Sequence, residues 1–335
     1  MDNFPNSDGK LVMTCTPLRI SFAGGGTDID EFYLREYGAV LSTAINKYVY
    51  VTVKQHGHLF QEQYRLNYAE TENVNTLDEI KNDIARECLR LVPVDPPIYI
   101  STVGDVPAAS GLGSSSSFAV GLLKALHALR GERVSPAQLA QEAVHVEVNI
   151  LKHPIGKQDQ YAAAYGGFNM IRFMTDGSVN LEQHSSMTTN IGEIFSHAQI
   201  FWTGITRDSG SVLTEQKQRT NENLNSLVAL RDQAEDLNRL IRNGIEIKEL
   251  GGIMNEGWRL KRDLASKITN SDIDAWYDKV ISAGAYGGKL CGAGGGGFLL
   301  FLTPPDKRKA VSAALSHLEE LKIDFEPQGA RVLTA

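Results

Sequence analysis

The chain has 335 residues and a formal net charge of −7 at pH 7. This length is enough for one or two globular domains, and the negative charge argues against a nucleic-acid-binding protein. Its three cysteines, Cys15, Cys88 and Cys291, have no disulfide or metal-site spacing, and neither a signal peptide nor a membrane-spanning apolar run is present. We therefore expect a cytoplasmic protein without membrane contact.

The first half of the chain alternates predicted strands and helices. Strands are predicted at residues 11–15, 39–45, 49–54, 64–68, 98–102 and 168–173. Helices are predicted at residues 76–91, 115–129 and 136–150, the last with Ser135 as N-cap and Pro136 as its first residue. This mixture indicates an α+β (mixed α/β) fold.

The second half of the chain is predicted to be mainly helical. A strand at 199–203 precedes helical stretches at 211–243, 245–267 and 277–285, and a strand at 298–302, a helix at 307–321 and a strand near 325–332 follow. The turn residues at 176–178 mark the change of pattern. We therefore expect an N-terminal domain over residues 11–180 and a C-terminal domain over residues 181–335.

An early glycine-rich segment combines a short apolar stretch with polar side chains. Arg19 lies in the apolar stretch, Gly24, Gly25 and Gly26 follow, and Thr27 and Asp28 come next. Polar groups around a glycine turn suit a hydroxylated ligand. A tight turn capped by Asp28 explains the same residues equally well.

A second glycine-rich segment, residues 107–117, reads PAASGLGSSSS and runs directly into an amphipathic helical pattern. Small residues let the backbone approach a ligand, and a helix N-terminus offers free N–H groups and the positive end of its dipole to an anion. The predicted phosphate-binding residues are Gly111, Leu112, Gly113, Ser114, Ser115 and Ser116. A flexible Gly/Ser linker is the alternative, and the helix that follows disfavours it.

The third glycine-rich segment, residues 292–297, formally fits the G-x-G-x-x-G pattern of dinucleotide-binding proteins. In those proteins the pattern follows a strand and opens a helix. Here a strand at 298–302 follows the glycines, and Pro304 and Pro305 end it. This context disfavours an NAD-binding protein.

Together, the three glycine segments resemble the three motifs of the GHMP kinases, a superfamily that includes galactokinases, homoserine kinases, mevalonate kinases and phosphomevalonate kinases. The matching residues are Pro17, Arg19, Gly24, Thr27 and Asp28, then Pro107 and 111–115, then 289–298. The resemblance covers nearly the whole chain in the family's order. It implies an S5 domain 2-like N-terminal domain, a ferredoxin-like C-terminal domain, and an active site between them that uses ATP and Mg²⁺.

The same resemblance implies catalytic roles. Residues 156–160 are similar to the galactokinase-type G-x-x-D-Q segment, so Asp159 is expected to be the catalytic aspartate with Arg19 beside it. Ser115 and Glu147 are the expected magnesium ligands, with Ser114 and Ser116 as alternatives to Ser115. Alternative interpretations are a solvated helix position for Glu147, a helix N-cap for Asp159 and a surface ion pair for Arg19.

The resemblance also indicates the acceptor. The substrate-binding residues expected are Gly25, Gly26, Thr27, Asp28, Lys157, Arg207, Gly294 and Gly295. Asp28 matches the aspartate with which galactokinases hold sugar hydroxyls. The pair Gly25–Gly26 stands where galactokinases carry Glu-His, and we interpret the loss of both side chains as room for a bulkier or phosphorylated tail.

This early segment most closely resembles that of the bacterial D-glycero-α-D-manno-heptose 7-phosphate kinases and their relatives, the fucokinases. The resemblance implies phosphorylation of the anomeric (C1) hydroxyl to the 1,7-bisphosphate, toward GDP-heptose for cell-surface glycans. A 7-phosphate needs cations. Lys152, His153, Lys157 and Arg207 are the candidates, with Lys157 and Arg207 favoured because both lie in glycine-containing loops.

Two other functions stay open at this point. One is another monosaccharide 1-kinase, such as an L-fucokinase, and the other is a sugar- and ATP-binding sensor without turnover. The presence of Arg19, Glu147 and Asp159 argues against a sensor, which need not keep them. The expected partners are small molecules, a sugar phosphate and ATP, and a homodimer is one option for the oligomeric state.

Overall fold

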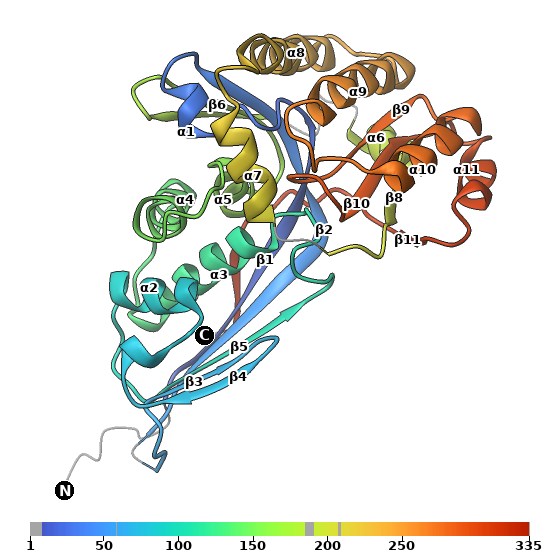
Figure 1. Cartoon of the computed structure of the whole chain (residues 1–335). Coiled ribbons are helices and arrows are strands. Elements are labelled where there is room, and N and C mark those ends of the chain that lie inside the picture. The colour runs from blue at the N-terminus through green and yellow to red at the C-terminus, as the bar shows by residue number, and fades with distance from the viewer. Residues whose placement is uncertain (1–8, 58, 185–190, 207–208, 335) are drawn as a thin grey trace, which may run out of the picture.

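The computed structural model describes residues 9–57, 59–184, 191–206 and 209–334. Figure 1 shows a large sheet, a smaller sheet beside it, and helices packed around both. The large sheet has the order β12-β1-β2-β5-β3-β4, and β6 and β7 extend it along the other part of β2. Its strands are β1 (Leu11–Ala23), β2 (Gly38–Gln55), β3 (Tyr64–Asn67), β4 (Thr71–Val74), β5 (Ile98–Gly104), β6 (Phe168–Phe173), β7 (Val179–His184) and β12 (Arg331–Thr334).

The two central strands of this sheet are longer than predicted. The strands expected at 39–45 and 49–54 are one strand, β2, whose first half pairs with β6 and whose second half pairs with β5. Strand β1 continues through Arg19 to Ala23 and is contacted by α3 and α5 as well as by α8 and α9. Because it is covered on both faces, it lacks the apolar–polar alternation of a half-exposed strand.

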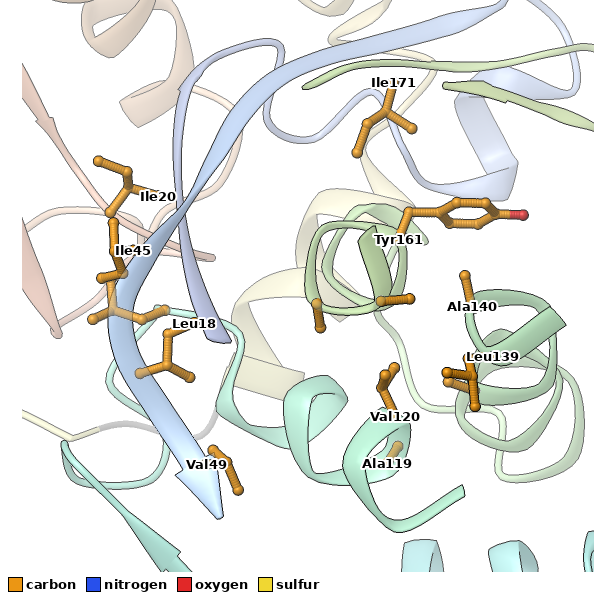
Figure 2. Packing of buried hydrophobic residues seen from close by; sticks show 14 of the residues in the cluster. Leu18, Ile20, Ile45, Val49, Ala119, Val120, Leu139, Ala140, Tyr161 and Ile171 are labelled. Atoms are coloured by element: carbon orange, nitrogen blue, oxygen red, sulfur yellow. The ribbon is translucent and has the colours of Figure 1, made fainter. Parts of the chain in front are cut away.

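Helices cover one face of the large sheet and form the main core with it. They are α1 (Asp30–Tyr33), α2 (Asp83–Leu91), α3 (Ser114–Leu129), α4 (Pro136–Val144) and α5 (Gln158–Tyr165). Figure 2 shows part of this core: Ala119, Val120, Leu139, Ala140 and Tyr161 lie together between α3, α4 and α5, whereas Ile20 and Ile45 point to the other side of β1 and β2. As expected, Ser135 caps α4, because its hydroxyl accepts a hydrogen bond from Gln138 N at 3.1 Å.

The smaller sheet has the order β11-β8-β10-β9 and is antiparallel throughout. Its strands are β8 (Ala198–Trp202), β9 (Gly287–Leu290), β10 (Phe298–Leu302) and β11 (Glu319–Leu321). The helices of this half are α6 (Ile191–His197), α7 (Ser209–Gln218), α8 (Leu224–Arg242), α9 (Ile247–Arg262), α10 (Ser271–Ser282) and α11 (Arg308–Ala314). Along the chain, this half has a strand, several helices, two strands, a helix and a last strand. With the sheet order given above, this is the ferredoxin-like arrangement, as predicted.

Several predicted helices have other bounds than expected. The helix expected at 76–91 begins only at Asp83, because Thr76 caps the 3₁₀ turn η1 (Leu77–Glu79) and Asn82 then caps α2. The stretch expected at 211–243 is two helices, and the Asn223 amide between them donates to Leu264 O at 2.7 Å. The helix expected at 307–321 ends at Ala314, because residues 319–321 pair with β8.

The ends of the two halves are interleaved. Strand β7 lies in the large sheet after β6, and the chain returns from the smaller sheet to add β12 beside β1. The final strand is therefore Arg331–Thr334, not 325–332, and Phe325 only bridges to Ile45. The domain boundary near residue 180 stays a prediction. In the part of the chain that the structure describes, no helix is long and apolar enough to cross a membrane.

Candidate active site

A cleft of about 740 Å³ lies where the three glycine segments meet. Strand β1 contributes Arg19 to its wall, and α3 begins at it. The lining residues from the predicted segments are Arg19, Gly26, Asp28, Gly111, Gly113, Ser114, Ser115, Ser116, Asp159, Gly292, Gly294 and Gly296. Residues far apart in the sequence thus share one cavity.

Two glycine loops pack backbone against backbone at the floor of this cleft. A Cβ on Gly111 would stand 2.6 Å from Cys291 O, and a Cβ on Gly292 would stand 2.5 Å from Gly111 Cα. Both contacts are too short for any side chain, so these positions need glycine for space. Gly113, the N-cap of α3, has a φ of 82°, a left-handed conformation that favours glycine. This turn aims the first N–H groups of α3 into the cleft.

Arg19 and Asp159 form a two-pronged ion pair in the cleft. Arg19 Nε donates to Asp159 Oδ1 at 2.7 Å, and Nη2 donates to Oδ2 at 2.8 Å. The remaining guanidinium nitrogen, Nη1, donates to Gly111 O at 2.7 Å. The Arg19 guanidinium is therefore fixed by three hydrogen bonds, and it holds the Asp159 carboxylate in one orientation beside the N-terminus of α3.

Glu147 lies fully buried behind the α3 N-terminus. It is carried by η2 (His145–Ile150), a widened π-helical turn that continues α4. Its Oε1 accepts from Ser115 Oγ at 2.8 Å, and its Oε2 accepts from Gln160 Nε2 at 2.7 Å. Burial raises the pKa of Glu147, while the hydrogen bonds from Gln160 and Ser115 oppose the shift.

Asp28 forms a second carboxylate site near Asp159 in the cleft. Its Oδ2 accepts from Gln158 N at 3.2 Å and from Gln158 Nε2 at 3.0 Å, and its Oδ1 accepts from Gly26 N at 3.3 Å. A Cβ on Gly156 would stand 2.0 Å from Asp28 Oδ2, so glycine at this position leaves room for the carboxylate. Burial and then the charge of Asp159 raise the pKa of Asp28.

Comparison with known proteins gives a consistent result. Residues 75–167 match the family described as GHMP kinases N terminal domain, and residues 235–320 match GHMP kinases C terminal. The D-glycero-alpha-D-manno-heptose 7-phosphate kinase of Campylobacter jejuni is 30% identical over 94% of this chain and 96% of that protein. The chain belongs to the GHMP kinase family. Its mixed α/β fold and its predicted class, a phosphotransferase with an alcohol acceptor, are thereby confirmed.

Two further GHMP kinase relatives extend the comparison. The solved structure of a D-glycero-D-manno-heptose 1-phosphate kinase from Bacteroides thetaiotaomicron superposes with a TM-score of 0.78 at 24% identity, covering 97% of this chain and 99% of that one. At that identity the likeness shows the fold. The L-fucokinase/L-fucose-1-P guanylyltransferase of Bacteroides fragilis is 26% identical over 90% of this chain and 35% of that protein.

Not every residue predicted from the GHMP kinase motifs faces the cleft. Thr27 is fully buried, and its hydroxyl bonds Gly24 O and the backbone N of Ala39 within the turn. Lys157 Nζ donates to Gly177 O at 3.2 Å and lies 4.4 Å from the centre of the Tyr33 ring. Its ammonium thus points away from the cavity wall.

The other side chains predicted to bind the phosphate of the sugar do not lie together. His153 lines the cleft and pairs with Asp83 Oδ2 at 3.0 Å, whereas Lys152 is exposed. Arg207 lies outside the described residues. Gly294 lines the cleft, and Gly295 N instead donates to Ile268 O at 2.8 Å.

Sequence reasoning missed four polar residues at this GHMP kinase site. Gln158 and Gln160 hold the carboxylates of Asp28 and Glu147, and their position on either side of Asp159 is the signal that could have indicated them. Lys261 lines the cleft and Lys289 lies directly behind Ser21. Lys289 is the first residue of the stretch 289–298 that matches the third motif, but Lys261 has no motif around it.

Two side chains of the site, Ser115 and Glu147, fit the ligand preferences of a magnesium ion. The described ranges contain no group of three or more His, Cys, Asp or Glu side chains placed to hold a metal. Ser115 and Glu147 nevertheless supply a hydroxyl and a carboxylate in direct contact, and Mg²⁺ commonly uses one or two protein oxygens together with water and phosphate oxygens. A cation would also offset the cost of burying the Glu147 charge.

Proposed function

We propose that this protein transfers the γ-phosphoryl group of ATP to the anomeric hydroxyl of a phosphosugar, D-glycero-D-manno-heptose 7-phosphate, to give the 1,7-bisphosphate. The observation that carries the proposal is the Arg19–Asp159 pair, which lines one cleft together with the α3 N-terminus and Asp28. The name of the Campylobacter jejuni relative, a heptose 7-phosphate kinase, supports the choice of sugar.

Asp159 is the group that receives or orients the proton of the acceptor. In the transfer, the C1 oxygen forms a bond to the γ-phosphorus, the bond from that phosphorus to the β,γ-bridging oxygen breaks, and ADP leaves. The hydroxyl proton passes to the Asp159 carboxylate, which Arg19 holds in place. The fixed guanidinium also offers positive charge near the transferring group.

The phosphates of ATP are assigned to the loop at residues 111–116. Its small residues let the nucleotide approach the backbone, and the first N–H groups of α3 face the cleft. Ser115 and Glu147 would hold Mg²⁺, with Ser115 at the cleft surface and Glu147 behind it. An ion held by these two side chains would supply positive charge against the phosphates of ATP.

Asp28 is assigned to the sugar. Its carboxylate is buried and kept in place by Gln158 and Gly26, so it is a preorganised acceptor for sugar hydroxyls. It lies near Asp159 but is not hydrogen-bonded to it. This arrangement supports binding of the sugar ring at one carboxylate while the reacting hydroxyl meets the other.

An L-fucokinase is the second candidate, supported by the similarity to the Bacteroides fragilis protein. A sensor without turnover is disfavoured by the intact Arg19–Asp159 and Ser115–Glu147 pairs. A cytoplasmic location and a homodimer stay predictions.

A substrate panel tests the proposed function. ADP release with Mg·ATP should be fastest with D-glycero-D-manno-heptose 7-phosphate, and at least tenfold slower in kcat/KM with L-fucose, mannose or galactose. Mevalonate serves as the acceptor control from the same family. Fastest turnover with L-fucose would replace the proposed substrate, and ATP binding without any turnover would favour the sensor.

A further inference from the structure

We propose that Lys261 and Ser21, with Lys289 behind Ser21, bind the phosphate group that the acceptor sugar carries. The proposal rests on the proposed function in that the acceptor is a sugar phosphate. It puts these residues in the place of Lys157, whose ammonium contacts Gly177 and Tyr33 instead. Figure 1 shows the elements involved, α9 beside β9 and β1 in the centre of the molecule.

Lys261 is a buried cation at the cleft. It lies in the last turn of α9, and only 6% of its surface is exposed. Its Nζ donates to Gly292 O at 2.5 Å, and among the described residues no carboxylate lies within ion-pair distance of it. A buried charge that donates to a backbone carbonyl and forms no ion pair is costly unless a ligand compensates it.

Lys289 and Ser21 make a second donor beside Lys261. Lys289 Nζ donates to Ser21 Oγ at 3.2 Å, and Ser21 lines the cleft. Because Ser21 Oγ is the acceptor in this contact, its own proton is free to point toward a ligand. The described part of the chain offers that proton no other acceptor. The contact with Lys289 therefore leaves the Ser21 hydroxyl able to donate a hydrogen bond into the cavity.

The three groups converge on the space beside Gly25. A Cβ on Gly25 would stand 3.3 Å from Lys261 Nζ, 3.9 Å from Ser21 Oγ and 4.0 Å from Lys289 Nζ. Gly25 does not have a left-handed φ, so its backbone conformation does not require glycine. Because Gly25 has no side chain, the space between Lys261, Ser21 and Lys289 stays open for a ligand.

The electrostatics of this space favour an anion. Burial, and then the charge of Arg19, lowers the pKa of Lys261 to about 8, and burial followed by the charge of Lys261 lowers that of Lys289 to about 7. The charges of Asp28 and Asp159 oppose the shift at Lys261, and both carboxylates are already hydrogen-bonded, to Gln158 and Arg19. The lysines therefore repel each other in the free protein, and a bound phosphate would relieve that repulsion.

The position of Ser21 on β1 favours the acceptor's own phosphate, and not the transferring phosphoryl group, as the ligand of this site. Ser21 lies two residues beyond Arg19, so both side chains are on the same face of the strand about 7 Å apart. Arg19 contacts Gly111 on the nucleotide side, whereas Ser21 contacts Lys289 from the C-terminal sheet. That spacing suits the two ends of one seven-carbon sugar.

The test compares acceptor kinetics of Lys261→Met and Ser21→Ala with the wild type. For Lys261→Met, KM for D-glycero-D-manno-heptose 7-phosphate should rise about tenfold to hundredfold, since a hydrogen bond to a charged group is lost. KM for ATP and kcat/KM for the unphosphorylated heptose should change less than threefold. Ser21→Ala should show the same pattern with a smaller rise. Lys124→Met, a half-buried lysine of α3 away from the cleft, is the control.

Other outcomes would overturn the inference. Equal loss of kcat on the phosphorylated and unphosphorylated heptose would assign Lys261 to the transferring phosphoryl group. An unchanged KM for the heptose phosphate in both variants would remove the site. Thermal unfolding of each variant shows that the protein is folded, and Ser21→Ala, which keeps both lysines, guards against a packing effect of Lys261→Met.

A binding measurement without ATP separates this inference from the proposed function. Calorimetric titration compares D-mannose 6-phosphate with D-mannose. The wild type should prefer the phosphate ester at least tenfold, and Lys261→Met should lose that preference, even if the enzyme does not turn over a heptose phosphate. No preference in the wild type, or an equal preference in the variant, would contradict the phosphate site.

Discussion

Asp159→Asn should lower kcat by a factor of about 10² to 10⁴, the range expected when a general acid–base group is removed. The asparagine oxygen keeps one hydrogen bond from Arg19, so the site geometry and the KM values for ATP and sugar should change little. What is lost is the negative charge that receives the acceptor proton. Steady-state ADP release, with thermal unfolding to check the fold, measures this.

Asp176→Asn is the matched control for that variant. Asp176 is exposed, and its carboxylate accepts hydrogen bonds from Ser178 in a surface turn away from the cleft. Its replacement should leave kcat unchanged. A kcat of Asp159→Asn within threefold of the wild type would show that Asp159 does not handle the proton.

Glu147→Gln should raise the Mg²⁺ concentration needed for half-maximal activity by about 10- to 100-fold, the usual effect of weakening a metal site. Glutamine has the same shape and can donate to Ser115 Oγ while accepting from Gln160 Nε2. Because burial disfavours the charged form of Glu147, the neutral variant should be as stable as the wild type without Mg·ATP, or more stable. Magnesium titration of the rate and urea unfolding measure the two effects.

Glu142→Gln is the control for the metal site. Glu142 precedes η2 on α4, and its carboxylate pairs with His127 at 2.8 Å. Its replacement should affect stability and leave the magnesium dependence unchanged. If Glu147→Gln behaved in the same way, Glu147 would be a structural carboxylate and not a metal ligand.

The sequence was most informative where short segments carry the chemistry. The loop at 111–116, the turn at 24–28 and the segment at 156–160 each hold their residues within a few positions, and the structure brings all three to one cleft. The contact of Arg19 with Asp159 joins residues 140 positions apart. It was expected only because the segments resemble those of a known family.

Residues whose position depends on tertiary packing were not predictable. Lys261 lies in an ordinary helical pattern, and only the packing of α9 against β9 and β1 buries it beside the cleft. Lys157 lies beside the catalytic segment, yet its side chain turns toward Tyr33. A sequence gives the residue type at a position but not the direction of a long side chain.

The predicted bounds of two helices, 76–91 and 307–321, were wrong because of local interactions. Thr76 and Asn82 are both good N-cap residues, and the longer helix was predicted from the first although the second begins α2. The residues after Ala314 continue a weak helical pattern, but pairing with β8 makes 319–321 a strand. In both cases a nearby competing interaction outweighs helix propensity.

We expect the protein to transfer a phosphoryl group to the anomeric oxygen of a sugar phosphate bound in the cleft. Phosphorus NMR of the product formed from Mg·ATP and D-glycero-D-manno-heptose 7-phosphate tests it most directly. We expect a second phosphorus signal coupled to the anomeric proton, in a product that keeps its 7-phosphate. A new phosphate on any other carbon, or no product while ATP still binds, would contradict it.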